Sequence, residues 1–203
     1  MGMSLWYNIS ELFSQSMGDK ERERYWSELN RMNSAILLIP LFLIRYGLLL
    51  LINKNALPKA AFFPPMRGPE KVMHWVYQAS TIMFILYMFF LKIRMGAFWL
   101  YVGLTVYTLG VLLFALSTIS FAKPNIDGFN QNGLYRISRN PMYVAYFIYF
   151  LGCVFLTQSI VLFVLLCVFQ LSAHWIILSE ERWCRNSFGE KYVRYSQKVR
   201  RYI

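Results

Sequence analysis

The feature that most limits how this chain can fold is a series of apolar runs, each close to the length of a helix that crosses a bilayer. The runs cover residues 34–53, 72–92, 96–121, 142–157 and 159–179. In a helix, about 20 apolar residues cross the hydrocarbon of a bilayer, which is about 30 Å thick. We therefore expect an all-α, polytopic membrane protein with about five transmembrane helices, folded as a single membrane domain over residues 1–203.

The last two runs are expected to form a helical hairpin. Residues 142–157 make a run of only 16 residues, which as a helix extends about 24 Å and falls short of a full crossing. The polar residues Thr157 and Gln158 separate this run from the next one. The two helices need not reach the far side of the membrane before the chain turns back.

The segments outside the apolar runs also show helical spacing. In the N-terminal segment, residues 1–33, apolar residues are spaced for a short helix on the membrane surface, although a frayed terminus is the alternative: Leu5, Trp6, Ile9, Leu12 and Phe13. In the tail, residues 180–203, apolar residues recur every three or four positions between cations, which predicts an amphipathic helix: Cys184, Phe188, Tyr192, Tyr195 and Val199.

The net charge of +11 is explained by membrane topology and does not indicate nucleic-acid binding. Lys and Arg concentrate in the segments that flank the apolar runs. With five spans, one side would hold fourteen of these cations, including the tail, and the other side six. The excess of positive charge marks the cytoplasmic side. The rule therefore places the C-terminus, residues 127–143 and the pair Glu180 and Glu181 together in the cytoplasm.

The polar stretch, residues 127–143, separates two apolar runs and is where binding chemistry is expected. Asn140 followed by Pro141 predicts a helix start, because Asn is a favoured N-cap and Pro is favoured at the first helical position. Such a start can be plain capping, or it can present free N–H groups to an anion, with Arg139 beside it. Gly133 would let the backbone approach a ligand closely. Two tyrosines offer ring faces or hydroxyl groups: Tyr135 and Tyr143.

The carboxylates Glu180 and Glu181 follow the last apolar run. A negative pair at a helix C-terminus opposes the helix dipole. Tail cations, or a ligand that needs acceptors, must therefore compensate it. Ribose hydroxyls, an amine or a sulfonium cation would meet that need.

These motifs together resemble those of the membrane methyltransferases, a family that includes isoprenylcysteine carboxyl methyltransferase and the phospholipid methyltransferases. The first motif is Gly-Leu-Tyr-x-x-x-Arg-Asn-Pro-x-Tyr, residues 133–143. One hairpin later come Glu-Glu and then Phe-Gly-x-x-Tyr-x-x-Tyr, residues 188–195. The resemblance covers about 125–203, whereas residues 34–121 match only in being apolar.

The resemblance implies that S-adenosylmethionine binds in the C-terminal half, residues 122–203. The cofactor residues that it implies are Asp127, Gly128, Phe129, Asn130, Gly133, Tyr135, Asn140, Pro141, Met142, Tyr143 and Glu180. Catalytic roles are expected for Arg139, Glu181 and His174. Arg139 would strengthen the attraction of the helix start for an anion, and Glu181 or His174 could take a proton from a lipid amine.

The chain departs from the family's pattern in three places. Asn140 stands where the carboxyl methyltransferases have His, and Phe129-Asn130 where they have Leu-Val. Ile176 stands where they have an arginine that contacts the acceptor. Without that arginine, either His174 or Arg45 supplies the charge for a carboxylate acceptor, or the acceptor is a lipid amine or another small polar head group. We favour the second option.

The function expected from the sequence is methyl transfer from S-adenosylmethionine to a lipophilic, membrane-borne acceptor, either a lipid amine or an isoprenylcysteine-type carboxylate. The enzyme would need no metal, and its oligomeric state stays open. Two alternatives are a membrane reductase that uses a nicotinamide cofactor and a non-catalytic membrane adaptor. The polar stretch has no arginine cluster suited to a 2′-phosphate, which speaks against the reductase. The retained Glu and Arg residues speak against the adaptor.

Overall fold

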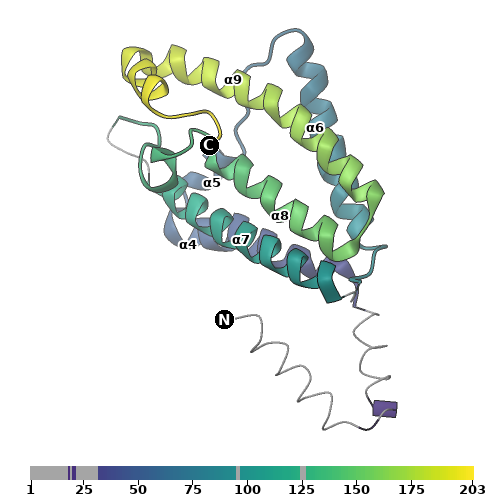
Figure 1. Ribbon diagram of the computed structural model, residues 1–203. Coiled ribbons are helices and arrows are strands. Elements are labelled where there is room, and N and C mark those ends of the chain that lie inside the picture. Colours follow the sequence, from purple (N-terminus) through teal and green to yellow (C-terminus); the bar gives the residue numbers. More distant parts are fainter. Residues whose placement is uncertain (1–17, 19, 22–31, 95–96, 124–126) are drawn as a thin grey trace.

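The computed structural model describes residues 18, 20–21, 32–94, 97–123 and 127–203, and within them every regular element is a helix (Figure 1). The expected surface helix at residues 1–13 and most of the charged segment after it lie outside this part of the chain. Three helical segments are long and apolar enough to cross a membrane: Ser34–Ile52, Phe98–Ala122 and Ile160–Lys198. The expected membrane character is thus supported, whereas the count of five spans stays a prediction.

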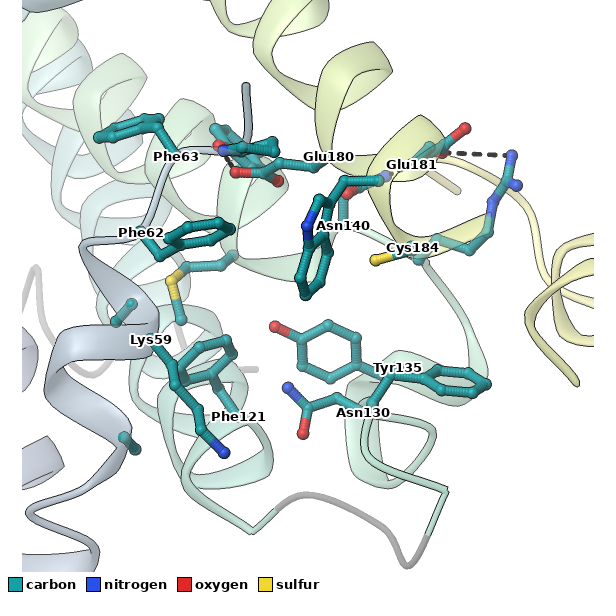
Figure 2. Close-up of a pocket in the computed structure, with 18 of the residues that line it drawn as sticks. Lys59, Phe62, Phe63, Phe121, Asn130, Tyr135, Asn140, Glu180, Glu181 and Cys184 are labelled. Carbon is teal, nitrogen blue, oxygen red and sulfur yellow. Dashed lines mark hydrogen bonds and ion pairs between the residues drawn. The ribbon is translucent and has the colours of Figure 1, made fainter. Parts of the chain in front are cut away.

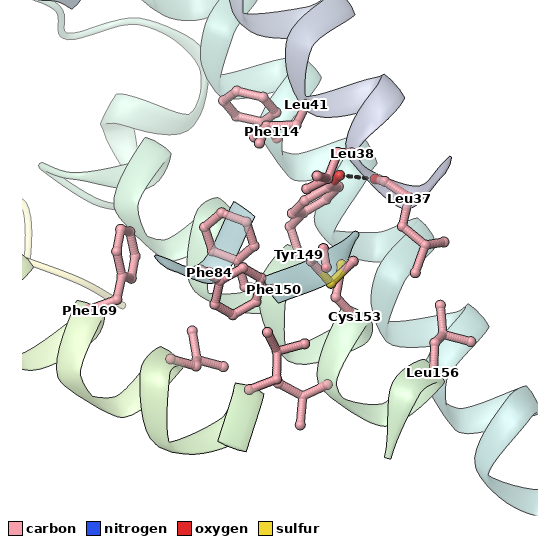
Figure 3. Close-up of a cluster of buried hydrophobic side chains, with 14 of the residues drawn as sticks. Leu37, Leu38, Leu41, Phe84, Phe114, Tyr149, Phe150, Cys153, Leu156 and Phe169 are labelled. Atoms are coloured by element: carbon pink, nitrogen blue, oxygen red, sulfur yellow. Dashed lines mark hydrogen bonds between the residues drawn. The ribbon is translucent and has the colours of Figure 1, made fainter. Parts of the chain in front are cut away.

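The first apolar run folds into a helix of mixed geometry. It consists of η1 (Ser34–Leu38, a 3-10 turn), α3 (Ile39–Phe42), η2 (Leu43–Leu48, a π-helical turn) and α4 (Leu49–Ile52). Pro40 has no N–H to give to the Leu37 carbonyl, which would be its 3-10 partner. The hydroxyl of Tyr107 donates to that carbonyl at 2.8 Å. Tyr149 donates to it as well (Figure 3), so an oxygen inside the apolar region is satisfied.

The remaining helices are α5 (Ala56–Ala60), α6 (Pro69–Met88), α7 (Ala97–Ala122), η3 (Gly133–Arg136), α8 (Pro141–Thr157) and α9 (Ile160–Lys198). Four of them contain most of a predicted run, namely α6, α7, α8 and α9, whereas α5 and η3 lie between the runs and were not predicted. In Figure 1, α7 lies beside α8 and α6 lies beside α9, and both pairs are in extensive contact. Aromatic residues from α6, α8 and α9 meet in the core, where Phe150 contacts both Phe84 and Phe169 (Figure 3).

The contact between α7 and α8 is close because glycines face the opposite backbone. A Cβ added at Gly110 on α7 would lie 2.4 Å from the Cα of Tyr149, and one added at Gly152 on α8 would lie 2.4 Å from the Cα of Tyr107. Small residues at such positions let membrane helices approach each other and gain van der Waals contact. This packing fixes the position of α8, whose first three residues are also the last three residues of the polar stretch.

The turn between α8 and α9 has the position that the sequence predicts. Helix α8 ends at Thr157, Gln158 adopts the left-handed conformation with φ of 50°, and Ser159 caps α9 by accepting from the Leu162 amide at 3.3 Å. The two helices therefore form a hairpin with a two-residue turn, as expected from the polar pair between the apolar runs.

The C-terminal tail is helical in two parts. Helix α9 continues through Glu180 and Glu181 as far as Gly189, whose φ of 54° and ψ of −136° are not helical, and a second helical part runs from this kink to Lys198. The amphipathic character expected of the tail stays a prediction. Beyond the kink, Tyr192 and Tyr195 form a buried cluster with Phe129 of the polar stretch. Three other apolar tail residues pack against the same cluster: Cys184, Phe188 and Val199. The apolar side of the tail thus covers the polar stretch.

We predict that Gly110→Leu lowers the free energy of unfolding by roughly 1–3 kcal/mol or more, because the added side chain would force α7 away from α8. The measurement is thermal unfolding of the purified protein in detergent micelles. Gly47→Leu is the matched control, since a Cβ at Gly47 has no neighbour within 4 Å. Equal unfolding temperatures for the two variants would contradict the close α7–α8 contact.

Candidate cofactor and acceptor site

A cavity of about 640 Å³ lies where the polar stretch meets α9 and the first half of the chain. This volume falls within the usual range for small-molecule sites. Figure 2 shows Lys59 and Phe62 from the first half of the chain on one side of the cavity and Asn130 and Tyr135 from the polar stretch on the other. Glu180 and Glu181 border it from α9.

Most of the residues predicted for the site line this cavity. They are Gly128, Phe129, Asn130, Tyr135, Arg139, Asn140, Met142, Tyr143, Glu180 and Glu181. Four predicted residues do not line it, namely Asp127, Gly133, Pro141 and His174. The prediction that the polar stretch and the glutamates meet in space therefore agrees with the structure, whereas the binding role of each residue stays a prediction.

Asp127 and Gly133 have structural contacts that account for their positions. Asp127 accepts from the Lys191 ammonium at 2.9 Å and from Gln131 at 3.1 Å, which ties the polar stretch to the end of α9. Gly133 has a φ of 56°, and a Cβ there would lie 2.2 Å from the Ser120 hydroxyl oxygen on α7. The close backbone approach expected at Gly133 is therefore made to α7 and not to the cavity.

The side chains of His174 and Ile176 also lie away from the cavity. The His174 Nδ1 atom is 2.6 Å from the Tyr202 hydroxyl near the C-terminus. Ile176 is completely buried in the protein and is not a lining residue. Of the two cations that the sequence analysis offered in place of an arginine at position 176, His174 does not line the cavity, whereas Arg45 does.

Asn140 occupies the N-cap position of α8, but its side chain does not cap the helix. This corrects the expectation of plain Asn capping. The side-chain amide donates instead to the Glu181 carboxylate at 3.3 Å and to the Arg201 carbonyl at 3.1 Å. The first turn of α8 is consequently left without a side-chain cap, with the positive end of the helix dipole beside the cavity.

Glu181 is buried and accepts from three side chains. Arg201 approaches it with Nε at 3.1 Å and Nη2 at 2.9 Å, Arg139 with Nη2 at 3.4 Å, and Asn140 with its amide. Its side chain is only 4% exposed. Tail and polar-stretch cations thus compensate this carboxylate, as expected from its place on the helix. Because both oxygens are engaged, the geometry suits Glu181 to positioning better than to taking a proton.

The C-terminal segment completes this arrangement by running beside the polar stretch. The Arg139 amide donates to the Arg200 carbonyl at 2.9 Å, within a parallel bridge between Ser138 and Arg200. The Ser138 hydroxyl donates to the Arg201 carbonyl at 3.3 Å. Figure 1 shows the C-terminus beside the start of α8. Sequence reasoning missed this contact, because nothing in residues 199–203 marks them as a partner for residues 138–140.

Glu180 is held differently from its neighbour. Its carboxylate accepts from the Tyr143 hydroxyl at 2.8 Å. Among the described residues it forms no ion pair. A carboxylate that borders a cavity with one neutral donor retains acceptor capacity for a ligand.

Two buried polar atoms at the cavity have no hydrogen-bond partner in the described part of the chain. One is the Oδ1 acceptor of Asn130, and the other is the Nε donor of Arg139. Both residues line the cavity. Buried polar groups are nearly always paired, so these two atoms have capacity for one donor and one acceptor from a ligand or from water.

The first half of the chain supplies a wall of which sequence reasoning named only Arg45, as a candidate source of charge for the acceptor. It includes Arg45 from η2, Lys59 from α5, and Phe62 and Phe63 from the segment after α5. Phe62 packs against Trp183 of α9, with ring centroids 5.4 Å apart. Arg45 within an apolar run was the available signal, because a charge there commonly marks a polar cavity.

An ion pair holds this wall against α9. Both terminal nitrogens of the Arg182 guanidinium donate to the Glu70 carboxylate, Nη2 at 2.6 Å. The Nη2 atom also donates to the Pro65 carbonyl at 3.4 Å. The hydrogen bonds from Arg182 to Glu70, together with one from the Arg67 amide at 2.8 Å, hold the pKa of Glu70 below its usual range. The segment between α5 and α6 is thereby fixed over the cavity.

Comparison with known proteins identifies one family. Residues 98–191, from the start of α7 to the last part of α9, match the family model described as phospholipid methyltransferase. No curated protein matches the chain significantly. The match begins earlier than the resemblance expected over about 125–203 and therefore includes α7, which was expected to match only in being apolar. It contains residues 133–143 and the glutamates, and it stops at residue 191, within the motif of residues 188–195.

We predict that the Glu70–Arg182 pair stabilises the protein above about pH 4.3, the usual pKa of Glu, by about 1 kcal/mol. Because the pKa of Glu70 is lowered in the fold, this contribution is lost as the pH falls through the lowered value. Glu70→Gln should therefore unfold at a lower temperature than wild type at pH 7, and the gap should close at lower pH. A gap that does not depend on pH would contradict the assignment.

We also predict that Arg201→Ala lowers the free energy of unfolding by about 1–3 kcal/mol, the scale of hydrogen bonds to a charged group. Arg200→Ala is the matched control, because that side chain is exposed and only its backbone is used. In a double-mutant cycle, Arg201→Ala and Glu181→Gln should be strongly non-additive. Additive effects would show that the contact between them carries no coupling energy.

Proposed function

We propose, from the match of residues 98–191 to the phospholipid methyltransferase family model, that this protein transfers a methyl group from S-adenosylmethionine to a lipophilic acceptor in the membrane. One observation carries the proposal. The cavity joins the polar stretch to the glutamates and leaves buried atoms of Asn130 and Arg139 without protein partners. S-adenosylmethionine offers groups that fit both atoms, because it has amine and hydroxyl donors and a carboxylate acceptor.

The residues that would hold the cofactor are those of the polar stretch that line the cavity, together with Glu180. The uncapped start of α8 and Arg139 suit a carboxylate. The amide oxygen of Asn130 suits an amine, and the rings of Phe129 and Tyr135 offer apolar faces to a base. Glu180 suits hydroxyl groups or positive charge. Asp127, Gly133 and Pro141 act on the site indirectly, through the backbone that they fix.

The chemistry depends on holding two reactants in line. When bound, the cofactor supplies an electrophilic methyl group on sulfur, which a lone pair of the acceptor displaces from the thioether. The protein's part is to fix the two reactants at a short distance, which can account for much of such a rate enhancement. The wall formed by Phe62, Phe63 and Trp183 would limit the access of water to the cavity.

The acceptor is a lipid amine or an isoprenylcysteine-type carboxylate. A carboxylate needs no base, whereas a protonated amine must lose a proton before it can attack. Glu181 is engaged by Arg201 and Arg139, and His174 lies outside the cavity. We therefore assign proton acceptance from an amine to Glu180, which borders the cavity and is held by Tyr143 alone among the described side chains.

The arrangement in the membrane follows from the same proposal. We propose five spans, with α6 and α8 crossing in addition to the three long apolar segments, and with the cavity facing the cytoplasm. The positive-inside rule supports this orientation, since most cations lie on the side of the tail. The cofactor would then enter from the cytosol and the acceptor from the bilayer.

We predict that Glu180→Gln weakens the binding of S-adenosylhomocysteine by about 1.5–3 kcal/mol, because it removes the charge from a hydrogen-bond acceptor and keeps its shape. Isothermal calorimetry of the purified protein measures this. Glu190→Gln is the matched control, because Glu190 is an exposed α9 residue that does not line the cavity.

The same titration carried out on the wild-type protein tests the proposed function as a whole. Wild-type protein should bind S-adenosylhomocysteine and not a nicotinamide cofactor. Binding of the nicotinamide cofactor alone would overturn the methyltransferase proposal in favour of a reductase.

A further inference from the structure

Arg45 is a charged residue in an otherwise apolar helix, and its side chain is directed toward the cavity. It lies in the π-helical turn η2, Leu43–Leu48, a geometry that is often found at functional sites. Its neighbours Leu43 and Tyr46 are 63% and 51% exposed on the outer surface. Arg45 is half-buried and lines the cavity. The π turn thus separates two lipid-facing side chains from one that faces the site.

The contacts of Arg45 leave its charge without a carboxylate. Its Nη2 atom donates to the Ala60 carbonyl at 2.6 Å, and its Nη1 atom donates to the Met142 sulfur at 3.1 Å. Within the described ranges no acidic side chain forms an ion pair with it. A guanidinium has five N–H donors, and a thioether is a weak acceptor. The group therefore has spare donors and no carboxylate in direct contact, an arrangement that is costly at membrane depth and that a bound anion would relieve.

Arg45 also comes from a part of the chain that is distinct from the segment proposed to bind the cofactor. The family match begins at residue 98, and all the cavity residues proposed to hold the cofactor follow it. Arg45 and Lys59 reach the same cavity from residues before the match. If the matched segment binds the cofactor, cations from outside that segment are available to bind the methyl acceptor.

The position of Arg45 relative to Glu180 supports this division. Arg45 contacts Met142, and Glu180 contacts the next residue of α8, Tyr143. A positive group from η2 and a negative group from α9 therefore border one cavity and contact adjacent residues of the first turn of α8, yet they form no ion pair with each other. Each is left to interact with a different part of a bound molecule.

We propose that Arg45 binds the anionic group, a phosphate or a carboxylate, of the membrane-borne acceptor. The inference rests on the proposed function and deepens it, because it names the acceptor as a lipophilic anion or zwitterion. The planar fork of a guanidinium matches the paired oxygens of either group. A lipid that carries an amine beside a phosphate would place its amine toward Glu180.

The test uses simple amphiphiles as probes, with purified protein in neutral detergent and binding measured by native mass spectrometry. The probes are dodecyl phosphate, dodecanoate and dodecyltrimethylammonium. Wild type should bind at least one anionic probe roughly ten- to a hundred-fold more tightly than Arg45→Gln does, the scale of losing a charge-assisted hydrogen bond. The two anionic probes distinguish a phosphate acceptor from a carboxylate one. The cationic probe should show no loss.

Arg94→Gln is the matched control, because Arg94 is exposed and does not line the cavity. The dissociation constant of S-adenosylhomocysteine should be the same for wild type and Arg45→Gln within about two-fold. If Arg45→Gln instead loses this affinity, Arg45 holds the cofactor, and the proposal is overturned. Equal binding of the anions by both proteins overturns it as well. If wild type fails to bind S-adenosylhomocysteine at all, the proposed function fails separately from the result with the anions.

A second measurement on wild-type protein covers the case in which Arg45→Gln does not fold. Phenylglyoxal modifies accessible guanidinium groups, and peptide mass spectrometry locates the modified residue. The anionic probe that binds should protect Arg45 from modification and leave Arg94 unprotected. Equal modification of Arg45 with and without the probe would contradict the proposal.

Discussion

The buried carboxylate of Glu181 is the contact on which the site depends. It lies at the meeting point of three segments that are far apart in the sequence, since Arg139 and Asn140 come from the polar stretch, Glu181 from α9 and Arg201 from the C-terminal segment. A buried charge of this kind is tolerated only when its partners are in place. The cluster therefore ties the position of α9 to the position of the polar stretch. The cavity exists because these two elements are held together at one end.

The helices of the second half provide the rigid frame for that cluster. Glycines let α7 and α8 approach backbone to backbone, and the short turn at Gln158 returns the chain directly into α9. The start of α8 and the middle of α9 are thereby brought to the same level. The apolar tail residues then close over Phe129. Together, these packing contacts bring polar and aromatic side chains from α8, α9 and the polar stretch to the same cavity.

The charges at the cavity bear on the choice between acceptors. The sequence comparison at Ile176 favoured an amine, since that position lacks the arginine of the carboxyl methyltransferases. The structure buries Ile176 inside the protein and brings Arg45 to the cavity from the first span. The missing cation at one position is thus matched by a cation from another part of the fold. The lack of a cation at position 176 is therefore no longer an argument against an anionic acceptor. An acceptor that carries both an anion and an amine is equally compatible with these charges.

The sequence by itself determined most of the helices and the polar segment that borders the cavity. Apolar run lengths, the Asn140-Pro141 helix start and the polar pair at Thr157 and Gln158 are local signals, and local backbone preferences respond to them directly. The tertiary structure alone decided the partners of those residues. The pairing of Glu181 with Arg201, the loss of Asn140 as a capping side chain, the contact of His174 with Tyr202 and the arrival of Arg45 at the cavity all join residues that are distant in sequence. No local pattern encodes such contacts, because they depend on how whole helices pack and on which buried charges that packing forces together.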